Sequence, residues 1–266
     1  RRRNLIQPAR FPYRTHLGET YDAGDFVRML ERVLEAADWN GFDARRAESK
    51  RQGKMRGRGL AVYIEWTGAL PTETVDIRVD ADGTVTVFSG TQAMGQGLET
   101  SYAQLITEVL QVPLGQVKIV QGDTDQANGM GSVGSRSAFV GGSAVVAAGR
   151  KTVARGKELA ADALESAAAD IEYRNGRFSI AGTDRSIALA ELAAKQPEKH
   201  IRVSATETPS SPSWPNGAQV CELEIDPETG EIALASFTSV DDIGRIINHM
   251  IAEGQIHGGI AQGVGQ

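Results

Sequence analysis

The sequence predicts an α+β fold of two similar lobes, each with β-hairpins in a mixed sheet packed against helices. Turn dipeptides such as Asp82-Gly83 and Asn175-Gly176 lie between short alternating apolar runs, a pattern that indicates β-hairpins. A hairpin, a polar or glycine-rich loop and a helical stripe follow one another over 73–111 and again over 218–266. This repetition predicts two α+β lobes that face each other over a cleft.

Residues 1–58 are predicted to form an extended N-terminal segment followed by surface helices. The first 23 residues are rich in Arg, Pro and Tyr and show no period. Apolar residues at helical spacing over 24–38 predict a helix that is capped by Asp25. The run 42–54 is highly charged, which indicates a helix on the surface.

The first lobe is predicted to span 59–200 and to hold two glycine-rich loops. Its expected elements are a buried strand at 59–66, a hairpin of 75–79 and 84–89, a helix at 100–111, a strand at 117–120, a long helix at 138–168, a hairpin of 171–173 and 177–180, and a short helix at 189–195.

The second lobe is predicted to begin at 201 and to be truncated at 266. Its expected elements are a strand at 201–207, an irregular crossing at 208–216, a hairpin of 220–225 and 231–240, and a helix at 250–266.

Composition places the chain among ordinary globular proteins. It has 266 residues, of which 41% are hydrophobic and 23% charged, and its net charge is −6. An acidic balance argues against a nucleic-acid partner, and no apolar run is long enough for a membrane span.

Without a visible signal peptide, we expect a cytoplasmic protein. The chain starts with Arg and ends inside a helical pattern, so we expect a fragment of a longer protein.

The single cysteine, Cys221, excludes an intrachain disulfide and a cysteine-bound cluster. It lies in VCELEID, an alternating strand pattern, and we expect a small buried hydrophobe. Any iron–sulfur centre that serves this protein would therefore lie on another chain.

The first candidate site is GTQAMGQGLET, residues 90–100, in which Met94, Gly95 and Gln96 precede a helix. Glycine lets backbone N–H groups approach a ligand, and the helix start adds a partial positive charge. Gln96 can donate and accept hydrogen bonds without charge, which suits carbonyl, oxo or ring-nitrogen groups. The alternative is a tight loop that needs positive φ angles.

The second candidate site is GSVGSRS, residues 131–137, which also precedes a helix. Its three hydroxyls, one guanidinium and free backbone N–H groups would suit a phosphate. The Gly-Lys-[Ser/Thr] ending of a Walker A loop is missing, and the literal GxGxxG match at 129–134 lacks the expected strand and acidic residue. The alternative is a Ser-rich helix cap.

The last helix carries two different faces. Ile256, Ile260 and Val264 form an apolar stripe, whereas Gln255, Gly259, Gln262 and Gln266 form a thin polar face. Contact with a polar group and tight helix packing through glycine both explain this face.

Residues that would carry acid–base or metal chemistry are not found in the sequence. The four histidines lack metal-ligand spacing, and no Gly-x-Ser-x-Gly elbow is present. Asp241 and Asp242 are adjacent on a predicted strand and would point to opposite faces. We therefore predict no catalytic residue and no protein metal ligand in this chain.

Nearly the whole chain resembles one family, the molybdenum hydroxylases, which include xanthine dehydrogenase, aldehyde oxidase and aerobic carbon monoxide dehydrogenases. The resemblance rests on the joint order of RRRNLI, FPYRTHLGETYDAGDF, GTQAMGQGLETSYAQ, GSVGSRSAFVGG, VCELEIDPETGEI and INHMIAEGQIHGGIAQGVGQ. These motifs look like the molybdenum-binding large subunit, and the N-terminal part looks most like the bacterial carbon monoxide dehydrogenase large chain.

The resemblance implies cofactor-binding roles for residues in all three candidate stretches. It matches Met94, Gly95 and Gln96 to the stretch that contacts the pterin and the oxo ligands. It matches Ser132, Gly134, Ser135 and Ser137 to the loop that holds the cofactor's phosphate and pterin, and Gln262 to a glutamine that contacts the pterin. The implied cofactor is a molybdenum cofactor of the molybdopterin cytosine dinucleotide type, and the implied partners are a small-molecule substrate and subunits that carry iron–sulfur clusters and FAD.

The resemblance also implies that parts of the active site lie outside these residues. The glutamate that acts as base in the family lies beyond the point where this sequence ends, and an upstream glycine-rich loop and a cysteine-bearing loop are not matched. Cys221 does not correspond to that cysteine. We therefore expect these 266 residues alone to be inactive and to lack the cofactor.

Two rival interpretations remain from the residues themselves. A module that binds a nucleotide or phosphate ligand without chemistry would use the same loops. A purely structural α+β domain would use the glycines for packing.

Overall fold

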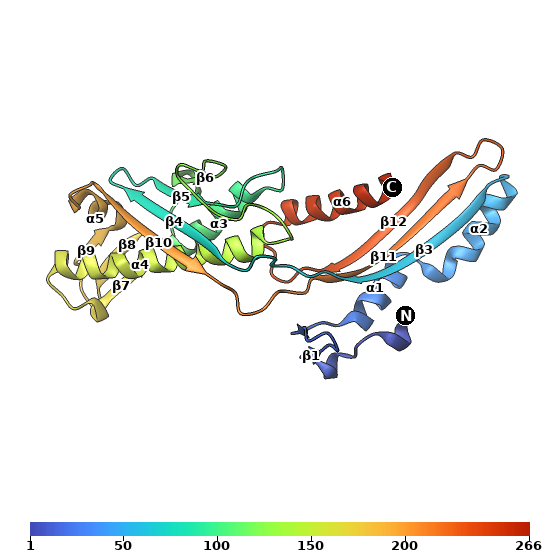
Figure 1. Ribbon diagram of the computed structural model, residues 1–266, viewed down its shortest axis with the longest axis horizontal. Helices are drawn as coiled ribbons and strands as arrows, with labels where there is room; N and C mark the ends of the chain where they lie inside the picture. Colours follow the sequence, from blue (N-terminus) through green and yellow to red (C-terminus); the bar gives the residue numbers. More distant parts are fainter. The chain divides into compact units, whose positions relative to one another are not determined.

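The computed structural model describes all 266 residues, which divide into two compact units (Figure 1). Unit 1 comprises Arg1–Trp66 and Ser213–Arg245, and unit 2 comprises Thr67–Pro212 and Ile246–Gln266. Each unit is thus built from two separate stretches of chain, whereas the division expected from the sequence pattern follows the chain continuously. That continuous division stays a prediction.

Unit 1 is a three-stranded antiparallel sheet with helices on one face. The strand order is β12–β11–β3, with β3 at Met55–Ile64, β11 at Asn216–Ile225 and β12 at Ile232–Asp242. Helix α1 (Phe26–Ala36) packs on β11 and β12, and helix α2 (Phe42–Arg51) packs on β3. The smaller elements are η1 (Arg2–Asn4), η2 (Pro8–Arg10), β1 (Tyr13–Arg14), β2 (Thr20–Tyr21) and η3 (Trp39–Gly41).

The α1 helix forms as its sequence predicts. The Asp25 side chain accepts a hydrogen bond from Arg28 N–H at 3.0 Å, which confirms the predicted cap. Leu30 and Val33 are buried at helical spacing against Ala218 and Val220 of β11. This small cluster is the apolar core of unit 1.

The alternation of β11 explains why Cys221 is not fully buried. Val220 faces the core, so the next residue points to the other face of the sheet. There Cys221 is half-buried, which corrects the expectation of a buried hydrophobe. Partial burial raises the pKa of its thiol, so the thiol is a poor nucleophile at neutral pH.

Ion pairs join the charged helix α2 to the sheet. Glu222 of β11 is buried and lies 2.6 Å from Arg45 of α2 and 2.8 Å from Arg56 of β3. Ser49 of α2 donates to Glu224 at 2.5 Å. A helix with few apolar residues can pack here because its buried polar groups are all paired.

Unit 2 contains a four-stranded mixed sheet in the order β10–β4–β5–β6. Strands β4 (Glu73–Asp80), β5 (Val85–Ser89) and β10 (His200–Glu207) pair antiparallel, and β6 (Val117–Val120) pairs parallel to β5. Helices α3 (Leu98–Leu110), α4 (Gly142–Leu164) and α5 (Leu189–Lys195) belong to the same unit, with η4 (Leu114–Gln116), a π-helical turn at Ser137–Gly141 and η6 (Ala168–Asp170). A second sheet, β7–β8–β9, is formed by Ile171–Arg174, Arg177–Ile180 and Ser186–Ala188.

The core of unit 2 lies between the inner face of the four-stranded sheet and α3 and α4. Val75, Ile77 and Val87 of the sheet are fully buried in one cluster with Ile106 of α3 and Val145 of α4. The small residues of α4 permit close approach of α3, since a Cβ at Gly149 would lie 2.9 Å from Val109. The helices and strands expected from the sequence are present here, which confirms the α+β class.

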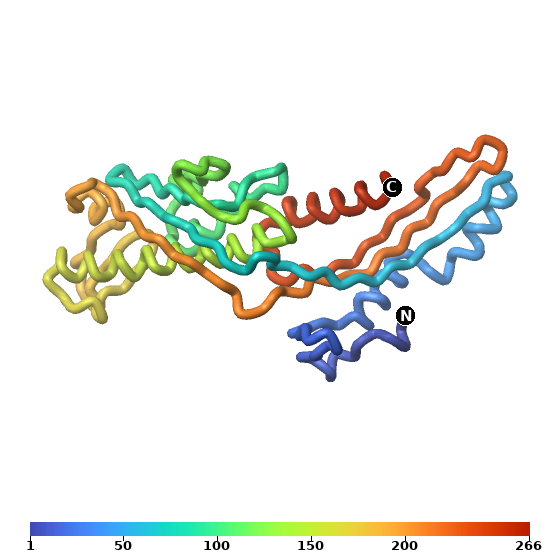
Figure 2. The backbone as a smooth tube through the Cα atoms, in the orientation of Figure 1, coloured from blue at the N-terminus to red at the C-terminus, as the bar shows by residue number.

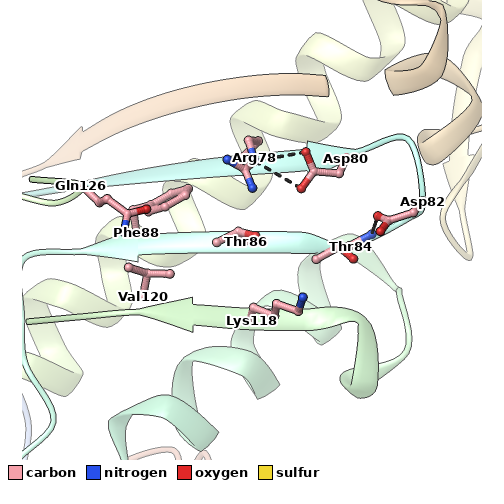
Figure 3. A pocket seen from close by; sticks show the side chains of 9 residues that line it. All are labelled: Arg78, Asp80, Asp82, Thr84, Thr86, Phe88, Lys118, Val120 and Gln126. Atoms are coloured by element: carbon pink, nitrogen blue, oxygen red, sulfur yellow. Dashed lines mark hydrogen bonds and ion pairs between the residues drawn. The ribbon is translucent and has the colours of Figure 1, made fainter. Parts of the chain in front are cut away.

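The opposite face of this sheet is polar. A shallow hollow on it is lined by Arg78, Asp80, Thr86, Phe88 and Lys118, among others (Figure 3). Arg78 pairs with Asp80 at 3.1 Å and also lies 5.7 Å from the centre of the Phe88 ring. The charges of this face are therefore mostly paired with one another.

Helix α6 (His249–Gly265) groups with unit 2, although it follows the β11–β12 hairpin of unit 1. Asn248 caps α6 and donates to Gln104 of α3 at 3.0 Å, and Ile251 packs against Gly97. These contacts join the helix start to α3. The path of the chain is drawn in Figure 2.

No helix of the structure combines the length and the apolar character that a membrane crossing requires.

Candidate functional site

The structure brings the first two candidate stretches into direct contact in unit 2. We call residues 90–97 the first glycine loop and residues 121–137 the second glycine loop. A Cβ at Gly90 would lie 2.5 Å from the Gly129 nitrogen, and a Cβ at Gly129 would meet the backbone of Gly90 in turn. The two backbones touch, so both positions require glycine.

Ser132 connects the two loops by hydrogen bonds. Its Oγ donates to the Gln92 carbonyl at 2.7 Å and accepts from the Gln92 N–H at 3.0 Å. The Ser137 hydroxyl donates to the Ser132 hydroxyl at 2.8 Å. Two of the serines predicted to bind a cofactor therefore lie side by side, and both hydroxyls already have partners within the chain.

A network of buried hydrogen-bonded hydroxyl groups also joins Thr91 of the first glycine loop to Ser137 of the second. Tyr102 of α3 donates to the Ser137 carbonyl at 2.7 Å, and its oxygen lies 2.9 Å from Thr91 Oγ1. Burial raises the pKa of Tyr102 to about 12, so it remains a neutral donor at pH 7. The Tyr102 hydroxyl also occupies the space that a side chain at Gly141 would need, next to the π-helical turn.

Gln96 uses its amide to shape the first glycine loop. Its Nε2 donates to the Gln92 carbonyl at 3.1 Å, and its Oε1 accepts from the Met94 N–H. Met94 is 61% exposed. Gly95 has φ +90° and no atom would lie within 4 Å of an added Cβ, so its backbone is open to an incoming group.

The side chain of Ser135 is the most available of the four predicted ligands in the second glycine loop. Ser135 is exposed, adopts φ +53°, and its hydroxyl has no partner within the chain. Its neighbour Gly134 is held by Ala69, whose N–H donates to the Gly134 carbonyl at 3.2 Å. The loop therefore presents one free hydroxyl from a backbone that is fixed on either side.

Arg136 is not available to a ligand, although the sequence pattern suggested its guanidinium as part of a phosphate site. Its side chain is fully buried and lies 2.6 Å from Glu73, which is equally buried. It also donates to the carbonyls of Gly131 at 2.7 Å and Thr72 at 2.8 Å. Sequence reasoning missed Glu73, because nothing in its strand pattern distinguishes it from an exposed acidic residue.

The third candidate stretch is placed differently. Gln262 is exposed on α6, eleven residues beyond Ile251, which corresponds to roughly 16 Å along a helix axis. Gly258, Gly259 and Gly263 face open space, so packing within this chain does not explain them. The structure thus joins two of the three stretches and leaves Gln262 apart from their contact.

The acidic pair at the end of β12 serves unit 1 and not a catalytic dyad. Asp241 accepts from Tyr63 at 2.5 Å and from Ser239 at 2.6 Å, while Asp242 accepts from the Gly244 N–H at 3.1 Å. No group of three His, Cys, Asp or Glu side chains is arranged to hold a metal ion. The described residues therefore offer hydrogen-bond donors and not metal ligands.

The donor set of the two glycine loops suits an oxygen-rich or anionic group. The second loop contains one basic residue, Arg136, whose charge is neutralised by Glu73. The exposed groups include open backbone at Gly95 and Gly131, the Ser135 hydroxyl and the acidic side chain of Asp125, whereas Gly97 and Leu98 at the start of α3 are covered. Open backbone N–H groups bind phosphate and carbonyl oxygens without a formal charge.

Comparison with known proteins matches the chain to one family. Residues 32–266 match the family described as the molybdopterin cofactor-binding domain. The chain is 35% identical to the carbon monoxide dehydrogenase large chain of Hydrogenophaga pseudoflava and 32% identical to the nicotine 6-hydroxylase large subunit of Paenarthrobacter nicotinovorans, over 99% and 100% of its length. Its fold matches the crystal structure of quinoline 2-oxidoreductase from Pseudomonas putida 86 with a TM-score of 0.88 at 33% identity, over all of this chain and 37% of the other.

The chain spans 36% and 35% of the length of these two curated relatives. The family match covers most of the sequence and includes both glycine loops and α6. The chain therefore belongs to the molybdopterin cofactor-binding domain family.

Proposed function

We propose that this chain forms part of the cofactor site in the large subunit of a molybdenum-dependent hydroxylase or dehydrogenase. In this proposal the intact enzyme hydroxylates a small molecule with oxygen from water. The observation that carries the proposal is the direct contact of the two glycine loops, joined by Ser132 and Gln92. Two open backbone segments that are held together in this way form one binding surface and not two independent turns.

The loops fit a pterin-type cofactor with a phosphate or pyrophosphate. Gly95 and Gly131 leave room for a ligand at the backbone, since neither has an atom within 4 Å of an added Cβ. The Ser135 hydroxyl would donate to a phosphate oxygen, and the exposed Met94 side chain would cover an apolar edge of the ring system. When bound, the cofactor would supply the oxygen-transfer and redox chemistry, while the protein supplies position and hydrogen bonds.

Gln96, Ser132 and Ser137 would act through the shape of the loops. Their side chains are hydrogen-bonded within the chain, so direct contact with a ligand would require these bonds to be exchanged. Gln262 would contact the cofactor from α6. No residue of this chain is proposed as the catalytic base.

The finer features of the proposal follow from the family resemblance. We propose the cytosine dinucleotide form of the cofactor, electron transfer to partner subunits that carry iron–sulfur clusters and FAD, and a cytoplasmic location. Relatives are named as subunits of larger enzymes, including a 6-hydroxypseudooxynicotine dehydrogenase complex subunit gamma. A chain with one cysteine would depend on other subunits for iron–sulfur centres.

The test is cofactor analysis of the full-length protein purified from its own host. We expect molybdenum and pterin in equal amounts, and release of a cytosine nucleotide after mild hydrolysis. Protein that contains neither molybdenum nor pterin would overturn the proposal, and a bound nucleotide without molybdenum would support a binding module instead. The Ser135→Ala variant should retain less cofactor, whereas Thr183→Ala on a distant turn of unit 2 should not.

A further inference from the structure

We infer that the buried ion pair of Glu73 and Arg136 is a positioning device for the second glycine loop, and that Arg136 does not touch the ligand. This inference rests on the proposed function of the loop as a cofactor site. Arg136 is the one basic residue of this loop. From the sequence pattern alone it would be interpreted as a phosphate ligand.

The Arg136 side chain links several separate segments within unit 2. Its side chain is 0% exposed, and its guanidinium donates to the Glu73 carboxylate and to the carbonyls of Leu70, Thr72 and Gly131 at 2.6 to 3.2 Å. These partners come from β4, from the segment that precedes it and from the second glycine loop itself. The planar guanidinium therefore joins the loop to the start of β4 and to the segment before it at several points.

Glu73 fixes the other side of the same contact. Its Oε1 lies 2.5 Å from the position that a Cβ at Gly129 would take, and it accepts a hydrogen bond from the Thr74 N–H at 3.3 Å. Gly129 in turn touches the backbone of Gly90. The carboxylate is thus packed directly beneath the place where the two loops meet.

The hydrogen bond from Arg136 to Gly131 also determines which backbone group faces outward there. In a trans peptide the C=O and the N–H point in opposite directions. Because the Gly131 carbonyl points to Arg136, the N–H of Ser132 in the same peptide points away from the buried pair. At this peptide the loop offers an N–H group and not a carbonyl on the side away from the buried pair.

The charges of the pair have a further consequence for an anionic ligand. An unpaired Glu73 beneath the loop would repel a phosphate and would be costly to bury. Arg136 cancels this charge, so neutral donors alone would hold the ligand. We therefore expect ligand retention to depend on the shape of the loop and not on a direct cation–phosphate contact.

The experiment uses the full-length protein, prepared with and without the cofactor. Arg136→Lys keeps the positive charge but cannot reach the same carbonyls with a planar fork, and Glu73→Gln keeps the shape but removes the negative charge. Arg150→Lys, on an exposed arginine of α4, is the matched control. The readouts are hydrogen exchange over 129–137 in the cofactor-free form, and molybdenum and pterin content in the loaded form.

We expect at least threefold faster exchange over 129–137 in both variants, at least threefold lower cofactor content, and no change in α4 or in the control. Lower content with unchanged exchange would mean that Arg136 contacts the ligand, and would overturn the inference. Unchanged exchange and content, or faster exchange throughout unit 2, would overturn it as well. Absence of cofactor from the unsubstituted protein would contradict the proposed function, while the exchange comparison would still decide whether the pair positions the loop.

Discussion

Gln92 and Ser132 hold each other by two hydrogen bonds although forty residues separate them. The Gln92 N–H donates to Ser132 Oγ at 3.0 Å, and Ser132 Oγ donates to the Gln92 carbonyl at 2.7 Å. One hydroxyl thereby satisfies both backbone groups of a residue in another loop. The relationship makes a single surface from two glycine loops that are far apart in the sequence.

Replacing Ser132 by Ala should separate the two loops. The change removes both bonds to Gln92 and the bond from Ser137, and we expect it to cost about 1 to 2 kcal/mol in the free energy of unfolding. Denaturant unfolding and hydrogen exchange at the Gln92 amide would measure the effect. Ser135→Ala is the matched control, since its hydroxyl has no partner in the chain, and equal losses in both variants would contradict this role of Ser132.

Replacing Gly90 by Ala should force the glycine loops apart. The added Cβ would lie within 2.5 Å of Gly129 backbone atoms, which cannot rotate away as a side chain could. We expect destabilisation of roughly 1 to 3 kcal/mol, as for other overpacked sites. Thermal or denaturant unfolding would measure it, with Gly115→Ala as the control because a Cβ there meets nothing within 4 Å. A Gly90 variant as stable as this control would refute the close contact.

The stability of unit 1 should depend on the ionisation of Glu222. The hydrogen bond from Arg45, with a smaller contribution from Arg56, lowers the pKa of Glu222. Because the folded-state pKa lies below the unfolded one, the stabilisation is present above the unfolded pKa and is lost as pH falls through the folded pKa. Glu222→Gln should therefore cost roughly 3 to 5 kcal/mol at pH 7.

The difference between the unsubstituted protein and Glu222→Gln should shrink as the pH is lowered below about 4. Urea unfolding at a series of pH values would follow it. Glu231→Gln, at an exposed position, is the control and should have little effect at any pH. A difference that stays constant from pH 7 to the acid limit would show that ionisation of Glu222 does not contribute.

Replacing Tyr102 by Phe should loosen the π-helical turn before α4. The change removes the donor to the Ser137 carbonyl and the contact with Thr91, with an expected cost of about 1 kcal/mol. Hydrogen exchange across 137–141 would locate the effect, and Tyr13→Phe serves as the control. In the unsubstituted protein two tyrosine signals, those of Tyr102 and Tyr173, should titrate near the pKa of about 12. The signal that is lost in the variant would be that of Tyr102.

Most elements could be predicted from local patterns. The helix that begins after Asp25, the strand over Val117–Val120 and the helix over Leu189–Lys195 lie where period and caps place them. Such features depend on residues a few positions apart, so the sequence contains the information directly. The two glycine-rich loops were also recognisable as candidate sites, because their residue types suit close backbone approach.

The partners of the polar side chains could not be predicted in the same way. Arg136 looked like a phosphate ligand beside three serines, yet the structure turns it inward to Glu73. Gln96 looked like a ligand of a neutral group, yet its amide bonds to Gln92 and Met94. A side chain's partner depends on which distant segment lies beside it, and local spacing does not contain that information.

The sequence by itself determined the α+β class, the glycine loops at the helix starts and the resemblance to a cofactor-binding family. These follow from periodicity, from glycine's conformational freedom and from the order of motifs along one chain. Only the tertiary structure decided that the two loops touch at Gly90 and Gly129, that Ser132 joins them, and that Arg136 is buried. The physical reason is that burial and pairing are set by packing between segments far apart in the chain, where each buried polar group must find a partner.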